Sequence, residues 1–181
     1  RRTAQALQLM RQDRSECSTM VRLILALTAL LATSGLAQAQ DAGQIARVQA
    51  GQSCPGCNLF QAELAYRDLP GIDLSGARLR QANLALVTMN RARFDGADLS
   101  IANLFGGRFT GASFRNADLS RANLVGAYFG SADFSGANLS GATLSGAEMA
   151  GVRGLTQTQL SSACGDAWTQ LPAGLSLPAC H

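Results

Sequence analysis

A repeat of five residues is the feature that most restricts how this chain can fold. From Leu59 to Met149, every fifth position holds leucine, phenylalanine or methionine, without an insertion over nineteen units. The residue two places before each of these is alanine in fourteen units. An α-helix repeats about every 3.6 residues and a strand about every 2 residues, so neither explains this period.

A short strand followed by a corner does explain it. Two inward side chains separated by one outward residue make a three-residue strand, and the other two residues must turn the chain. Glycine often holds the second corner position, as in "SGANLSGA", because it adopts backbone angles that other residues resist. Strands and corners in alternation predict a coil, and stacked coils form a solenoid.

The sizes of the large residues predict four units per coil. When every fourth unit is compared, two columns hold only leucine, and the other two hold all the phenylalanine and methionine residues of the series. Such columns form when each coil of twenty residues lies directly on the coil before it. The leucine columns are Leu59, Leu79, Leu99, Leu119, Leu139 and Leu64, Leu84, Leu104, Leu124, Leu144. Nineteen units then make about five coils, in a stack about 24 Å long.

These units resemble the pentapeptide repeat family, whose motif is A(D/N)LxX. "GADLS", "IANLF", "NADLS" and "RANLV" match this motif closely, and the resemblance covers about residues 57–153. It implies an all-β fold, a right-handed quadrilateral β-helix. Arg67 occupies an inward position, and we expect its charged end to extend past the open end of the first coil.

Both open ends of such a stack need covers, because they expose unpaired strand edges. After Gly154, Thr156 and Gln159 fit a capping box, and Leu155 and Leu160 fit a hydrophobic staple. These residues predict a short helix over residues 157–164, ended by Gly165. We expect Trp168, in the tail that follows, to add apolar cover.

The N-terminal part resembles a secretory signal. From Met20, one arginine precedes an apolar run and then small residues, and Ala37 and Ala39 fit the pattern that signal peptidase accepts. The alternative is a retained membrane anchor, but the apolar run of 17 residues is at the short limit for a span. We expect residues 1–39 to be a leader removed at export. The other expected parts are an N-terminal extension (40–53), the β-helix (54–153) and a C-terminal cap (154–181).

This division removes the apparent positive charge. The formal charge of +3 lies entirely in residues 1–39, whereas residues 40–181 hold ten arginines and ten acidic residues. We therefore expect no nucleic-acid partner, since binding one needs a positive field over one face. We also expect a periplasmic or extracellular location, with no stable membrane anchor after cleavage.

Four cysteines remain after cleavage, and an even number in an exported chain indicates disulfides. Cys54 and Cys57 precede the repeats, while Cys164 and Cys180 follow them. Disulfide Cα atoms lie only about 4.4–6.8 Å apart, so the stack length predicts the pairs Cys54–Cys57 and Cys164–Cys180. "CPGC" is also compatible with a redox motif, although such motifs act at a helix N-terminus. A zinc site would need two further ligands nearby.

Catalysis has few candidate residues. The only histidine is His181, so a positioned base for a nucleophile is missing. Asp98 and Asp118 should stack within one column, but we interpret them as solvated surface charges. Asn83, Asn103 and Asn123 should form an amide ladder between Glu63 and Thr143. We expect no enzyme activity, cofactor or metal.

One corner column is apolar where the others are polar. Tyr66, Leu86, Phe105 and Val125 should form an exposed apolar stripe, with Ile101 on the preceding corner. Scattered apolar side chains on a surface are common and need no functional cause, whereas a contiguous stripe more often marks an interface. The leading hypothesis is therefore an exported, non-enzymatic structural or interaction module with a protein partner or a second copy of itself.

Two alternatives remain from the sequence. One is a periplasmic thiol–disulfide protein that uses Cys54 and Cys57. The other follows from the family resemblance and is a DNA mimic that binds topoisomerases, a role that requires a cytoplasmic location and a strongly acidic surface.

Overall fold

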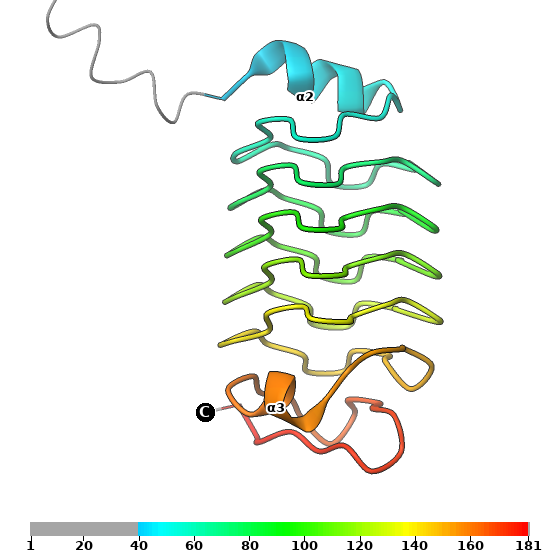
Figure 1. Ribbon diagram of the computed structural model, residues 1–181, viewed down its shortest axis with the longest axis vertical. Coiled ribbons are helices and arrows are strands. Elements are labelled where there is room, and N and C mark those ends of the chain that lie inside the picture. The colour runs from blue at the N-terminus through cyan, green and yellow to red at the C-terminus, as the bar shows by residue number, and fades with distance from the viewer. Residues whose placement is uncertain (1–39, 181) are drawn as a thin grey trace, which may run out of the picture. The chain divides into compact units, whose positions relative to one another are not determined.

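The structure is a computed structural model that describes residues 40–180. The predicted cleavage site at Ala37 and Ala39 and the terminal His181 lie outside these residues. Figure 1 shows the described part as a stack of flat coils, with helix α2 (Ala42–Gln49) across one end and α3 (Gln157–Leu160) near the other.

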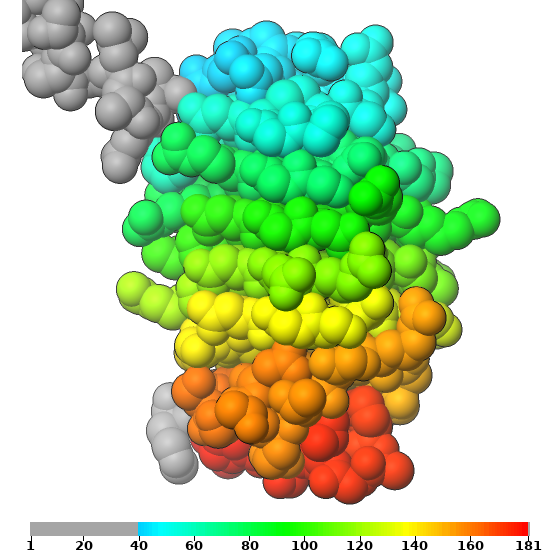
Figure 2. All heavy atoms as spheres, viewed as in Figure 1, coloured from blue at the N-terminus to red at the C-terminus, as the bar shows by residue number. Residues whose placement is uncertain are grey.

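The coil returns to the same edge after twenty residues. Parallel bridges join each outward residue to the residue twenty positions later, for example Arg78 to Asp98 and Asp98 to Asp118. This confirms four units per coil. Each three-residue segment contributes a single bridge residue, because the flanking corners leave no room for longer pairing. Figure 2 shows the outward side chains in rows, one above another.

The outward bridge residues define four faces, which we number in chain order. Face 1 carries Asn58, Arg78, Asp98, Asp118 and Asn138; face 2 carries Glu63, Asn83, Asn103, Asn123 and Thr143; face 3 carries Asp68, Thr88, Arg108, Tyr128 and Glu148; face 4 carries Asp73, Arg93, Ser113, Asp133 and Arg153. Two corner residues separate each face from the next.

The core is a column of side chains with no access to solvent. Leu79, Leu99 and Leu119 are fully buried, as are nearly all the large residues of the repeat. The phenylalanines stack between coils: the ring centroids of Phe94 and Phe114 lie 4.9 Å apart, and their planes differ by 7°. Burial of each large side chain contributes about 1.5–3 kcal/mol before the entropy of ordering the chain is subtracted.

The aspartate or asparagine of the repeat holds the following corner. Asp73 Oδ1 accepts hydrogen bonds from the Ser75 amide (2.9 Å) and the Ser75 hydroxyl (2.6 Å). A side-chain oxygen that accepts from the amide two residues later stabilises a turn. The amide contact recurs at Asn83, Asp98, Asn103, Asp118, Asn123, Asp133 and Asn138.

Helix α2 covers the N-terminal end, where the sequence suggested only an extension. Asp41 caps the helix by accepting from the Gln44 amide, and Val48 is fully buried in the core. Arg67 has an exposed side chain whose Nη1 donates to the carbonyl oxygen of Gln49, at 3.2 Å. The expectation for Arg67 is thus confirmed, and its charge lies at the C-terminal end of α2, where a cation is favourable.

The C-terminal cap begins as predicted and then differs. The capping box of Thr156 and Gln159 is present, but α3 ends at Leu160, and the predicted extension to residue 164 is wrong. Gly165 does not end the helix; it forms a bridge with Ala179. A Cβ at Gly165 would approach Thr169 Oγ1 to 2.7 Å, so close packing explains this glycine.

The tail continues faces 2 and 3 by one more level. Cys164 pairs with Thr143, and Gln170 pairs with Glu148. The chain takes one residue more between these two bridges than in a regular unit, and Trp168 lies in the longer corner. The prediction that Trp168 covers the core is wrong, because its side chain is 81% exposed.

Candidate interaction surface

The large exposed apolar side chains gather at the corner between faces 2 and 3. In the described residues these are Tyr66 (78% exposed), Leu86 (45%), Phe105 (45%), Tyr128 (37%) and Trp168 (81%). All but Tyr128 lie at this corner, and Tyr128 lies on the adjoining face 3. We use the name apolar edge for Tyr66, Leu86, Phe105, Trp168 and the half-buried Val125.

Backbone hydrogen bonds join the apolar edge from coil to coil. The Leu86 amide donates to the Phe105 carbonyl at 2.8 Å, and the Gly106 amide donates to the Val125 carbonyl at 2.9 Å. The predicted stripe of Tyr66, Leu86, Phe105 and Val125 thus lies along one corner. Ile101 does not join it, because face 2 separates its corner from this one.

Asp166 attaches Trp168 to the same corner. Its carboxylate oxygen Oδ1 accepts from the Gly146 amide at 2.9 Å, in the place where a backbone carbonyl accepts in the earlier coils. The same oxygen accepts from the Trp168 amide at 3.0 Å. The hydrogen bond from Gly146, with others from Trp168 and Thr169, lowers the pKa of Asp166. The sequence did not predict that Trp168 lies at this corner, because the five-residue period ends before it.

Two residues of the apolar edge have strained backbones. Tyr66 (φ 61°) and Leu86 (φ 55°) adopt left-handed conformations, whereas the next coils place Gly106, Gly126 and Gly146 at this position. This conformation costs a residue with a Cβ about 1–2 kcal/mol. The other non-glycine residues with a left-handed backbone are mostly polar, and the exposure of a polar side chain needs no explanation. Because Ile101 and several polar corner residues have the same left-handed conformation, this conformation belongs to the corner of the coil, and at Tyr66 and Leu86 it accompanies an exposed apolar side chain.

The predicted amide ladder on face 2 fixes the apolar edge in place. Asn103 Nδ2 donates to Asn83 Oδ1 at 3.2 Å, and Asn123 Nδ2 donates to Asn103 Oδ1 at 3.1 Å. Asn83 Nδ2 in turn donates to both carboxylate oxygens of Glu63. The same Asn103 oxygen accepts from the Phe105 amide at 3.2 Å. The ladder is confirmed, and it positions the backbone beneath Phe105.

Face 4 carries the ion pairs. Arg93 lies 3.4 Å from Asp73 and 3.5 Å from Asp95, and Arg115 lies 3.4 Å from Asp95. Burial raises the pKa of Asp95, but hydrogen bonds from Ser113 and Arg115 outweigh burial and leave this pKa below its usual value. Ser75 lowers the pKa of Asp73 in the same way. Exposed pairs of this kind contribute only about 0–1 kcal/mol each.

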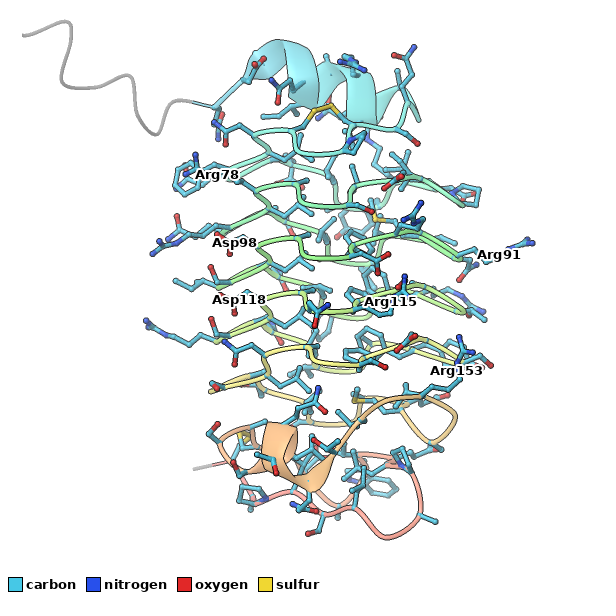
Figure 3. All side chains as sticks on the ribbon, in the orientation of Figure 1. Arg78, Arg91, Asp98, Arg115, Asp118 and Arg153 are labelled. Atoms are coloured by element: carbon cyan, nitrogen blue, oxygen red, sulfur yellow. A yellow bond between two sulfur atoms is a disulfide. The ribbon has the colours of Figure 1, made fainter. Side chains whose placement is uncertain are left out.

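The acidic column of face 1 shows no feature of a catalytic pair. Figure 3 places Arg78, Asp98 and Asp118 one above another on one side of the stack. Asp98 Oδ1 accepts from the Ser100 amide, and Asp118 Oδ1 accepts from the Ser120 amide and from Asn138 Nδ2. Both carboxylates therefore stabilise corners.

The cysteines pair as the stack length predicted. Cys54 is bonded to Cys57, and Cys164 is bonded to Cys180. Cys54 and Cys57 are buried, and α2 ends at Gln49, before the motif. The cysteines therefore lack the helix N-terminus at which C-x-x-C motifs act. Within residues 40–180, no group of three cysteine, histidine or acidic residues could hold a metal ion. The same residues include no helix long and apolar enough to cross a bilayer.

Comparison with known families decides the classification. The family described as pentapeptide repeats matches the chain in 8 copies, over residues 57–96, 97–136 and 122–153. These segments cover more than half of the chain. The chain belongs to the pentapeptide repeat family. Pentapeptide repeat proteins form right-handed quadrilateral β-helices and are generally non-enzymatic structural or interaction modules.

Solved pentapeptide repeat structures resemble the chain to a limited extent. A protein from the thylakoid lumen of Arabidopsis thaliana is 33% identical, over 54% of this chain and 68% of that one, with a TM-score of 0.39. A protein from Nostoc PCC 7120 is 26% identical, over 76% and 88%, with a TM-score of 0.48. HetL, involved in heterocyst differentiation regulation in Nostoc sp. strain PCC 7120, is 26% identical, over 71% and 60%, with a TM-score of 0.30. No curated protein matches the chain significantly.

Proposed function

We propose that this pentapeptide repeat protein is an exported, non-enzymatic module that binds a protein partner through the apolar edge. Its right-handed stack of about five coils acts as a rigid support. The observation that carries this proposal is the position of Tyr66, Leu86, Phe105 and Trp168 at one corner, in a chain whose other corners are mostly polar.

Export rests on the signal-like segment before residue 40 and on the two disulfides, which persist in oxidising compartments. Cleavage after Ala39 would leave a periplasmic or extracellular protein without a membrane anchor. Expression of a tagged full-length chain, followed by fractionation and N-terminal sequencing, tests this part of the proposal. A cytoplasmic chain that keeps its N-terminal segment would overturn it.

The two alternatives gain no support. A thiol–disulfide role needs an accessible sulfur, but Cys54 and Cys57 are buried. A DNA mimic needs an acidic surface, whereas arginines and acidic residues balance in residues 40–181.

Crosslinking in the cell envelope, followed by mass spectrometry, tests the partner. Phe105→Glu places a charge in the middle of the apolar edge and should abolish a specific crosslink, while circular dichroism stays unchanged. Ile101→Glu is the matched control, since Ile101 is an apolar corner residue outside the edge. Light scattering separates a protein partner from self-association. Equal crosslinking by the parent and Phe105→Glu proteins would refute the proposal.

A further inference from the structure

A small open pocket lies on face 3, next to the apolar edge. Its volume is about 290 Å³, and it is lined by Tyr128, Ser131, Glu148, Gln170 and the glycines at 130 and 151. Tyr128, Glu148 and Gln170 are consecutive residues along face 3, because Tyr128 pairs with Glu148 and Glu148 pairs with Gln170. The C-terminal tail thus completes a site that the repeats alone would leave open.

Tyr128 supplies an aromatic wall that is held in place. A Cβ at Gly130 would lie 2.7 Å from the Tyr128 hydroxyl oxygen and 2.9 Å from two ring carbons, so the side chain lies against bare backbone. The guanidinium carbon of Arg108 lies 5.8 Å from the ring centroid. Arg108 and Glu148 flank Tyr128 on opposite sides along face 3. The ring is therefore fixed from the Arg108 side, and the side toward Glu148 lines the pocket.

The polar groups of the pocket have no partners among the described residues. The Tyr128 hydroxyl, the Ser131 hydroxyl, the Glu148 carboxylate and the Gln170 amide group form no hydrogen bond within residues 40–180. At the corner between faces 3 and 4, the Arg91 amide donates to the Thr110 carbonyl of the next coil. This series of backbone hydrogen bonds stops at Ser131, whose amide donates to no described residue. One aromatic ring is thus surrounded by several free donors and acceptors.

From this arrangement we propose that the pocket binds one pyranose ring of a neutral glycan. A pyranose presents C–H groups on one face, which pack against an aromatic ring, and hydroxyls at its rim, which both donate and accept. The Glu148 carboxylate can accept hydrogen bonds from the sugar hydroxyls, the Ser131 amide can donate to them, and the Gln170 side chain can do both. The volume of about 290 Å³ is just below the range of about 300–1,000 Å³ for ligand pockets, which suits a single ring.

The charges disfavour other small ligands. Glu148 repels a phosphate or sulfate, because it is the only ionised side chain that lines the pocket. A cation would be attracted to Glu148, but Arg108 beside the Tyr128 ring opposes it. A neutral, hydroxyl-rich ring is compatible with both charges.

NMR titration of the protein comprising residues 40–181 tests the proposal directly. The probes are methyl glucoside, methyl galactoside, N-acetylglucosamine and their short oligosaccharides, with tetramethylammonium and inorganic phosphate as competing chemistries. We expect at least one neutral saccharide to shift the amide resonances of Ser131, Gly151 and Gln170 in a saturable manner, with a Kd of about 1 mM. The only tryptophan, Trp168, lies two residues from Gln170 and gives an independent fluorescence signal.

Four variants separate the contributions. Tyr128→Leu should weaken saccharide binding about tenfold, and Gln170→Ala should also weaken it, whereas Tyr128→Phe keeps the ring and should retain most of the affinity. Glu148→Gln keeps an acceptor and should bind the saccharide nearly as well. Tyr66→Leu removes an exposed tyrosine outside the pocket. It is the matched control for saccharide binding, which it should leave unchanged.

Three results would overturn the proposal. They are the absence of a saturable shift with every saccharide, shifts that map away from Tyr128, and a response to tetramethylammonium alone that Glu148→Gln abolishes. Phe105→Glu should leave saccharide binding intact, so the failure of the apolar edge and the failure of this pocket are distinguishable.

Discussion

Gly154 lies against the backbone of Ser135 in the coil before it. A Cβ built on Gly154 would contact the Ser135 hydroxyl oxygen and would approach the Ser135 amide nitrogen to 2.7 Å and its Cα to 2.8 Å. Gly154 also has a left-handed backbone (φ 70°). The repeat ends at this residue, where the chain leaves the stack for the C-terminal cap.

Substitution of this glycine should therefore be unusually costly. Gly154→Ala combines the left-handed conformation, about 1–2 kcal/mol, with overpacking against backbone, about 1–3 kcal/mol. Gly146→Ala is the matched control, because Gly146 has φ 65° and no atom within 4 Å of a built Cβ. Chemical denaturation should show a clearly larger loss of unfolding free energy for Gly154→Ala. Equal losses would contradict the contact with Ser135.

A charge at Leu99 should abolish folding. Leu99 is fully buried, and an aspartate there would lie between Leu79 and Leu119 without a partner. Leu99→Met keeps the volume and should cost less than about 1.5 kcal/mol. Expression in soluble form and circular dichroism check both variants. A soluble Leu99→Asp protein with the parent spectrum would show that the register is wrong.

Acid should destabilise the protein through its hydrogen-bonded aspartates. Asp73, Asp95 and Asp133 have folded-state pKa values below the ordinary value of 3.8. The unfolded chain therefore binds more protons in acid. The stabilisation is complete above the unfolded pKa and is lost as pH falls through the lower folded pKa. Unfolding free energy should be level near neutrality and should decrease below about pH 4.

Asp95→Asn separates this effect from general acid sensitivity. The amide carries no charge and loses the ion pairs with Arg93 and Arg115, so the variant should be less stable than the parent protein at neutral pH. Because the amide cannot titrate, the stability of the variant should depend less on acid. Urea denaturation at several pH values measures both. A variant with the same acid dependence as the parent protein would exclude Asp95 as a source.

The two disulfides should differ in importance. Cys164–Cys180 closes a segment with a sequence separation of 16, and a loop of this length is stabilised by about 3 kcal/mol. Cys54–Cys57, with a separation of 3, closes a much shorter loop and should contribute less. Thermal unfolding of Cys164→Ser/Cys180→Ser and Cys54→Ser/Cys57→Ser proteins compares them. A larger loss for the Cys54 pair would contradict the loop-length argument.

The repeat was sufficient to predict the coil. A period of five is incompatible with helix and strand, and columns of matched size at Leu79, Leu99 and Leu119 are explained only by a return after twenty residues. The pairing of the cysteines and the ladder at Asn103 follow from the same register, because a solenoid translates sequence distance directly into position along its axis.

The ends and the pocket depended on tertiary structure. The sequence predicted only an extension over residues 40–53, and the burial of Val48 in the core shows that helix α2 covers this end. Trp168 lies beyond the last repeat, where the five-residue period no longer predicts which side chains point inward, and its side chain is exposed. Gln170 lines the pocket with Tyr128 and Glu148 because the tail continues face 3 beyond the last repeat. Local pattern determined the regular coils by itself, whereas the non-repeating segments acquired their positions only from the surfaces that the coils left uncovered.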